Sequence, residues 1–218
     1  VRRIWRNAEK RALLDVSAQT VQAPTAHRGY DALGRGIEWA VLDTGITASH
    51  PHFARYGNVA AEYDCTQPGR LAEGGTAPDR NGHGTHVAGI IAGYGEFPAA
   101  DDGPPRVLTG IAPAARLHVY KVLDDDGMGR DAWIIKALDH VARTNERAGR
   151  ARIAGVNLSL GGPFDVSAFG CGHTPLCNEL RRLWRQGVVV VLAAGNEGFA
   201  VIQTLDGGSV DANMDLSI

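Results

Sequence analysis

The chain has 218 residues, of which 44% are hydrophobic and 21% charged, and its formal net charge is −2. This composition is typical of a globular domain and excludes a disordered or fibrous chain. The nearly balanced charge argues against a nucleic-acid-binding protein, and no apolar run approaches the ~18 residues that a membrane helix needs.

Residues 1–28 differ from the rest of the chain because they are locally basic and precede the first clear strand. Charged and apolar residues are interspersed at its start, so it lacks the apolar stretch of a signal peptide. One interpretation is an N-terminal arm that wraps around the core. We treat residues 29–218 as a separate domain.

From residue 36 onward, apolar runs that predict strands alternate with amphipathic segments that predict helices. Strands are predicted over 36–42, 116–123, 153–160 and 188–193, the last being a continuous β-branched run typical of a central parallel strand. This alternation predicts an α/β fold with a doubly wound, mostly parallel sheet and helices on both faces.

Apolar stripes at helical spacing mark the predicted helices. Three helices are predicted in this way: a short helix after His83, with Val87, Ile90 and Ile91; a helix over 130–147, with Ile134, Ile135, Leu138, Val141 and Ala142; and a helix over 175–186, with Leu176, Leu180, Leu183 and Trp184. The composition of 67–81 and 96–106 predicts surface loops.

Asp43 follows the first predicted strand directly, and Thr44 and Gly45 allow the chain to turn away after it. The carboxylate is therefore expected at the carboxyl edge of the sheet, where open α/β sheets bind their ligands. Taken alone, the same pattern also fits an aspartate that caps a turn at the end of a strand.

His83 lies between two glycines, just before a predicted helix for which Thr85 is a candidate cap. A histidine whose ring is held by a carboxylate can take a proton from a hydroxyl group. A zinc site shared with His86 is the alternative, although Gly84 stands where a His-Glu-x-x-His motif has its glutamate. We interpret His86 as a packed or hydrogen-bonded neighbour and expect no metal or other cofactor.

Asn196 follows the β-branched strand, after the small residues Ala193, Ala194 and Gly195. Its side-chain amide can donate a hydrogen bond to an oxygen that becomes negative during acyl transfer. The alternative is that Asn196 is a loop residue that adopts the left-handed conformation shortly before Gly198.

Three segments together resemble the aspartate, histidine and oxyanion-hole blocks of the subtilisin-like serine proteases (peptidase family S8). They are 41–46 (Val-Leu-Asp-Thr-Gly-Ile), 81–89 (Asn-Gly-His-Gly-Thr-His-Val-Ala-Gly) and 193–198 (Ala-Ala-Gly-Asn-Glu-Gly). Segments 121–129 and 157–161 resemble the borders of that family's peptide-binding cleft. The resemblance covers about residues 35–200.

This resemblance implies a three-layer α/β/α fold and a serine endopeptidase that acts on peptides or proteins outside the cell. Asp43 would orient His83, His83 would act as general base and then acid, and Asn196 would stabilise the oxyanion. Substrate would bind along Ser159, Leu160 and Gly161 as an added strand, beside Ala193, Ala194 and Gly195. Residues 1–28 would then be the end of a propeptide, and this interpretation stays open beside that of an arm.

The nucleophile is missing from this pattern, because none of the serines stands in a Gly-Thr-Ser block followed by an apolar helix. They are Ser17, Ser49, Ser159, Ser167, Ser209 and Ser217. We therefore expect residues 29–218 to be a partial peptidase domain, incomplete at its C-terminus and inactive alone. The serine would come from further sequence or from a second fragment. A non-catalytic module that binds extended peptides is the alternative function.

Three further features of the sequence concern calcium binding, the charge of the substrate and a disulfide. His52 stands where many subtilisin-like proteases carry a calcium-binding aspartate, so calcium is not expected there. The acidic run 124–126 has two readings, a solvated loop or a surface that favours basic substrates. Cys171 and Cys177 can close a short disulfide loop or remain two small buried residues, and Cys65 has no evident partner.

Overall fold

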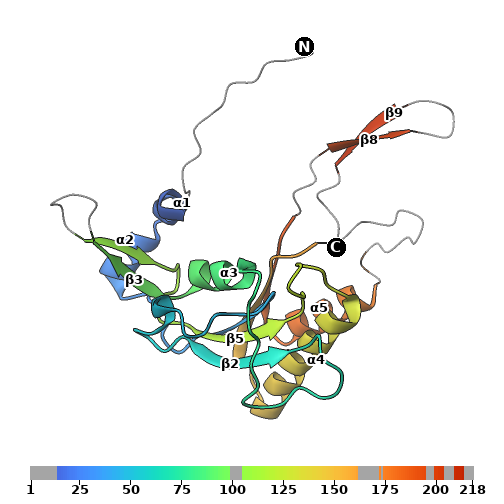
Figure 1. Ribbon diagram of the computed structural model, residues 1–218, viewed down its shortest axis with the longest axis horizontal. Helices are drawn as coiled ribbons and strands as arrows, with labels where there is room; N and C mark the ends of the chain where they lie inside the picture. Colours follow the sequence, from blue (N-terminus) through green and yellow to red (C-terminus); the bar gives the residue numbers. More distant parts are fainter. Residues whose placement is uncertain are drawn as a thin grey trace.

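The computed structural model describes residues 14–98, 105–161, 172, 174–194, 199–203 and 209–213. Its centre is a five-stranded sheet, of which β2 and β5 are labelled in Figure 1. The strand order is β2-β5-β1-β6-β7. The strands are β1 (Glu38–Asp43), β2 (Val59–Asp64), β5 (Arg116–Lys121), β6 (Ile153–Leu158) and β7 (Val189–Leu192). Every neighbouring pair is parallel. The predicted mostly parallel α/β fold is therefore confirmed.

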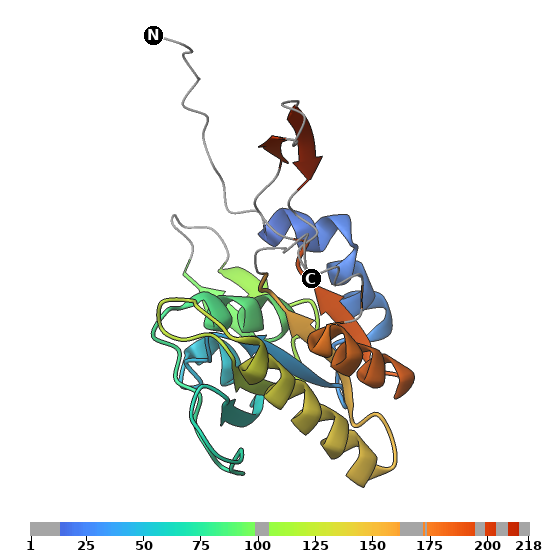
Figure 2. The ribbon, with the colours of Figure 1, turned by 90° about the vertical axis from the view of Figure 1, so that its right-hand side faces the viewer.

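Helices cover both faces of this sheet (Figures 1 and 2). Helix α3 (His83–Ile91) lies on one face, whereas α4 (Asp131–Ala148) and α5 (Pro175–Arg185) lie on the other. A short 3-10 helix, η1 (Pro51–Phe53), connects β1 and β2. Two helices precede the sheet, α1 (Leu14–Thr20) and α2 (Ala23–Tyr30). Within the described residues, no helix is both long and apolar enough to cross a membrane.

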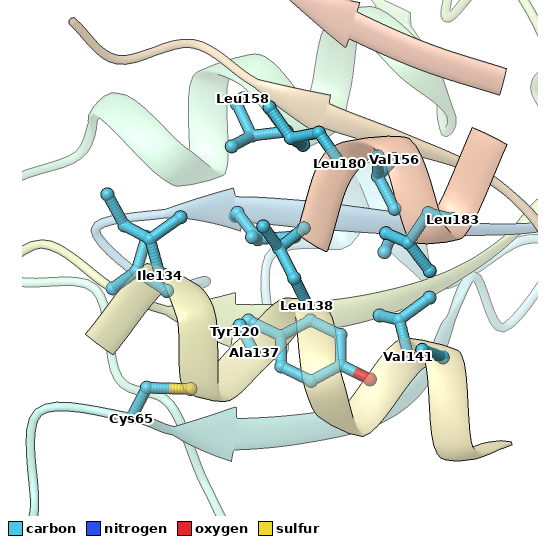
Figure 3. Close-up of a cluster of buried hydrophobic side chains, with 14 of the residues drawn as sticks. Cys65, Tyr120, Ile134, Ala137, Leu138, Val141, Val156, Leu158, Leu180 and Leu183 are labelled. Atoms are coloured by element: carbon cyan, nitrogen blue, oxygen red, sulfur yellow. The ribbon is translucent and has the colours of Figure 1, made fainter. Parts of the chain in front are cut away.

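The alternation of side chains along β1 explains why helices are needed on both faces. Ala40 and Leu42 pack into the hydrophobic cluster under α4 and α5, while Val41 between them packs into the cluster under α3. All three are fully buried. Figure 3 shows the larger cluster, to which Leu138 of α4, Leu183 of α5 and Tyr120 of β5 belong. A strand buried on both faces is what its uninterrupted apolar sequence predicts.

The ends of α4 and α5 are fixed by side chains. Asn145 is buried near the end of α4, where its amide donates to the Ile153 carbonyl and accepts from the Ile153 N–H. Thr174 caps α5 by accepting from the backbone N–H of Cys177. Between the two helices, Arg182 pairs with carboxylates from both, namely Asp139 and Glu146 of α4 and Glu179 of α5.

Two details differ from the sequence-based predictions. Trp184 was assigned to the buried stripe of α5, but it is 71% exposed because the buried stripe ends at Leu183. The predicted loop 96–106 has strands at its ends, since β3 (Tyr94–Phe97) pairs antiparallel with β4 (Arg106–Thr109). The domain boundary expected at 28/29 stays a prediction; helix α2 spans it, and His27 Nε2 lies 2.9 Å from the Ile111 carbonyl oxygen.

At the C-terminal end, β7 is the outermost strand of the sheet and carries exposed apolar side chains. Val189, Val191 and Leu192 are 54%, 42% and 38% exposed. Two further strands, β8 (Phe199–Gln203) and β9 (Ser209–Asn213), form a separate antiparallel pair.

Candidate active site

Asp43 is the last residue of β1, the central strand of the sheet, and its side chain is fully buried. Its Oδ1 accepts a hydrogen bond of 2.7 Å from the backbone N–H of Thr44. Its Oδ2 is buried and has no hydrogen-bond partner among the described residues. Burying a carboxylate is costly without compensating donors, so the group that faces Oδ1 offsets part of this cost.

His83, the first residue of α3, supplies the second donor to Oδ1. Its Nδ1 lies 2.7 Å from Oδ1 of Asp43, and because an ionised carboxylate can only accept, Nδ1–H is the donor. The side chain of His83 is 49% exposed, whereas that of Asp43 is buried. Nε2 makes no hydrogen bond to any described residue. In this tautomer Nε2 carries the free lone pair, so it can take a proton from a group that approaches from the solvent side.

Two glycines allow this close approach. A Cβ on Gly84 would lie 2.3 Å from the Gly45 carbonyl oxygen and 3.1 Å from Asp43 Oδ1. Gly45 has a φ of +116°, and a Cβ there would lie 2.4 Å from the Ala77 carbonyl oxygen. The Thr-Gly turn after Asp43 and the glycine after His83 are therefore both steric requirements of the contact.

The predictions for Thr85 and His86 are wrong. Helix α3 starts at His83 with Gly82 at its N-cap, so Thr85 lies inside the first turn and its hydroxyl instead donates to Asp79. His86 is exposed and makes no side-chain hydrogen bond in the described part of the chain. No group of three or more potential metal ligands occurs among the residues that the structure describes.

Asp125, the middle residue of the acidic run 124–126, pairs with two basic side chains of the protein. Lys121 is buried, and its Nζ donates to Asp125 at 2.9 Å and to the Thr44 carbonyl at 2.7 Å. Arg80 also pairs with Asp125. The hydrogen bond from Lys121, reinforced by the positive charges, lowers the pKa of Asp125 below its usual value. Sequence inspection missed Lys121, because a lysine at the end of a strand gives no sign that it will be buried.

The candidate substrate-binding residues follow two other strands of the same sheet. Ser159, Leu160 and Gly161 come directly after β6, and Ser159 Oγ accepts from Asn157 at 2.9 Å. Ala193 and Ala194 follow β7 and are exposed. Because β1, β6 and β7 are parallel neighbours, these segments leave the sheet at the edge where Asp43 lies.

Some predicted features lie outside the described residues. Gly195 and Asn196 belong to this group, as does Cys171, the expected partner of Cys177. Cys177 is half-buried. Cys65 is buried in the core, and burial raises the pKa of its thiol to about 12, so it is unreactive at neutral pH.

A second histidine–carboxylate pair lies at the opposite edge of the sheet and provides a useful comparison. His118 Nε2 is 2.6 Å from Glu38 Oε2, and Arg152 donates to the same oxygen. The side chain of His118 is only 6% exposed, and burial lowers its pKa. Pairing with a carboxylate therefore does not distinguish His83 from His118. The difference is that the ring of His83 is partly exposed, whereas that of His118 is buried.

Comparisons with known proteins agree with this arrangement. A model of the subtilase family, Peptidase_S8, matches residues 34–215. An extracellular serine proteinase of Thermus sp. (strain Rt41A) is 36% identical over 77% of this chain and 33% of its own length. Serine protease AprX of Bacillus subtilis (strain 168) is 35% identical over 91% of this chain and 42% of its own length.

Solved structures give the same result. That of sphericase matches with a TM-score of 0.61 and 31% identity, over 83% of this chain and 59% of sphericase. The chain spans well under half the length of the curated relatives named above, 33% and 42%. The family match, these relatives and the fold lead to one conclusion: the chain belongs to the subtilase family of serine proteases.

Proposed function

We propose that this chain supplies the aspartate and histidine of a serine endopeptidase that hydrolyses peptide bonds. The observation that carries the proposal is the 2.7 Å contact between buried Asp43 and half-exposed His83 in a chain of the subtilase family. Such a pair holds one imidazole tautomer and leaves Nε2 free to act as a base.

In the proposed reaction, a serine hydroxyl adds to the substrate carbonyl carbon and its proton passes to Nε2 of His83. The imidazolium then gives this proton to the leaving amine, and an acyl-enzyme remains. Water attacks the acyl-enzyme by the same route. Asp43 keeps the ring oriented and stabilises its positive charge throughout, and Asn196 would donate to the oxyanion.

The substrate in this proposal is an extended peptide or protein segment. It would pair with Ser159, Leu160 and Gly161 as an added strand, and Ala193, Ala194 and Gly195 would leave room for one of its side chains. We also propose an extracellular location, because the Thermus relative is named an extracellular proteinase.

We further propose that the nucleophilic serine is not among the six of this chain, since none has the Gly-Thr-Ser context. The isolated 218-residue chain is then expected to show no peptidase activity above background and no labelling by a fluorophosphonate probe. The measurement is gel fluorescence after labelling, with Subtilisin E as the positive control.

The His83→Ala variant is the matched negative control for this experiment. Labelling of the parent chain that disappears in the variant would mean that a serine within residues 1–218 is the nucleophile, which contradicts this proposal. A chain that stays inert but retains a peptide in a pull-down would favour the non-catalytic binding module.

A further inference from the structure

Asp79, in the loop before α3, uses both of its carboxylate oxygens. Oδ1 accepts from the hydroxyl of Thr44 at 2.9 Å and from the backbone N–H groups of Asn81 and Gly82 at 3.1 and 2.8 Å. Oδ2 accepts from the backbone N–H of Thr85 at 2.8 Å and from its hydroxyl at 2.5 Å. One side chain therefore connects the segment after β1 to the start of α3.

Asp79 also replaces the missing cap of α3. The N-cap residue is Gly82, which has a φ of 97° and no side chain to satisfy the free N–H groups of the first turn. Asp79 accepts from two of these groups and places a negative charge at the positive end of the helix dipole. Asp79, which lies outside the helix, therefore fixes the first turn of α3 and with it the backbone of His83.

The ionised form of Asp79 is strongly favoured. Burial by itself raises the pKa of Asp79, but the hydrogen bonds from Thr85, Gly82 and Thr44 outweigh burial and lower it to about 2. Because this pKa is lower in the folded than in the unfolded chain, the carboxylate stabilises the fold above about pH 4. That stabilisation is lost as the pH falls towards 2.

The link between Asp79 and the Asp43–His83 pair runs through Thr44. The Thr44 hydroxyl donates to Asp79 and at the same time accepts from the backbone N–H of Gly84 at 2.9 Å. Thr44 is bonded to Asp43 along the chain, and Gly84 to His83. Any shift of α3 away from β1 would therefore lengthen both hydrogen bonds of this hydroxyl.

We propose that Asp79 is a positioning residue, which fixes the distance between Asp43 and His83 by holding Thr44 and the first turn of α3 on one carboxylate. The inference rests on the proposed function of the pair. Asp79 then does more than cap α3, because capping requires only the hydrogen bonds to the first turn of the helix and not the one from the Thr44 hydroxyl.

The test is NMR of the full chain with 15N-labelled histidine, which reports on the proton between His83 Nδ1 and Asp43. In Asp79→Asn, an amide group would face the donors of Thr85, so the start of α3 should loosen. We expect the low-field Nδ1–H signal of His83 to exchange with solvent about tenfold faster, the scale of one lost hydrogen bond. Thr44→Val should have the same effect, and Thr44→Ser should restore the parent rate.

Two controls separate positioning from general destabilisation. Asp64→Asn removes another carboxylate that accepts from a threonine N–H and hydroxyl, those of Thr66, and should leave the His83 signal unchanged. The Nε2–H signal of His118, held by Glu38, is an internal reference in every variant. Unchanged exchange at His83 in both Asp79→Asn and Thr44→Val would overturn the inference. This readout needs no serine, so it is independent of whether the proposed peptidase activity exists.

Discussion

Replacing His83 with alanine is expected to lower kcat/KM for peptide hydrolysis about 10⁴-fold in a polypeptide that joins this chain to the proposed serine-bearing segment. The physical reason is that Nε2 of His83 is the proposed base, and the half-exposed ring is the only feature of the pair that a serine can reach. The measurement is steady-state hydrolysis of a chromogenic peptide.

Asp43→Asn should have an effect of similar size without removing the imidazole. An amide NH2 group facing Nδ1 would favour the tautomer with the proton on Nε2, which cannot act as a base. Asp64→Asn, at the end of the outer strand β2, is the matched control and should retain activity within a few-fold. A loss of less than about tenfold in either His83→Ala or Asp43→Asn would contradict the assigned roles.

Gly84→Ala is expected to have a large effect on the stability of the fold. The added Cβ would meet the Gly45 carbonyl oxygen at 2.3 Å and the Gly45 nitrogen at 3.0 Å, and both are backbone atoms that cannot rotate away. Helix α3 must then move from β1, which weakens the Gly84 hydrogen bond to Thr44 as well as the Asp43–His83 contact. We expect a loss of about 2–3 kcal/mol in the free energy of unfolding, typical of overpacking at a buried site.

Thermal or urea unfolding followed by circular dichroism measures this loss. Gly29→Ala is the matched control, because that glycine lies in α2 with nothing within 4 Å of the added Cβ. It should be neutral or slightly stabilising, since alanine favours helix more than glycine does. A Gly84→Ala chain as stable as the parent, with an intact His83 signal, would show that the close approach is not required.

The parts of the fold that could be predicted from the sequence are those with a local signal. The strand 188–193 is a continuous β-branched run, and the structure has β7 at Val189–Leu192. The stripe of α4 is equally clear, and Ile134, Leu138 and Val141 are all buried. Asp43 and His83 were found because each stands in a short motif, although only the fold brings them within 2.7 Å.

What could not be predicted depends on contacts between distant segments. Asp79 lies in a stretch whose composition indicates only a loop, and its role arises from a hydrogen bond to Thr44, 35 residues away. The predicted cap at Thr85 failed for the same reason, because the cap comes from that loop. The burial of Lys121 likewise depends on Thr44 and Asp125, which neither periodicity nor composition connects to it.

Asp43 and His83 are proposed to serve a serine that lies outside these 218 residues. This proposal is tested most directly by labelling a polypeptide that continues the reading frame past Ile218 with a fluorophosphonate and mapping the modified residue by mass spectrometry. We predict a single modified serine beyond residue 218, in a Gly-Thr-Ser context, with labelling abolished by His83→Ala. A modified serine within residues 1–218, or labelling that survives His83→Ala, would contradict the proposed roles of Asp43 and His83.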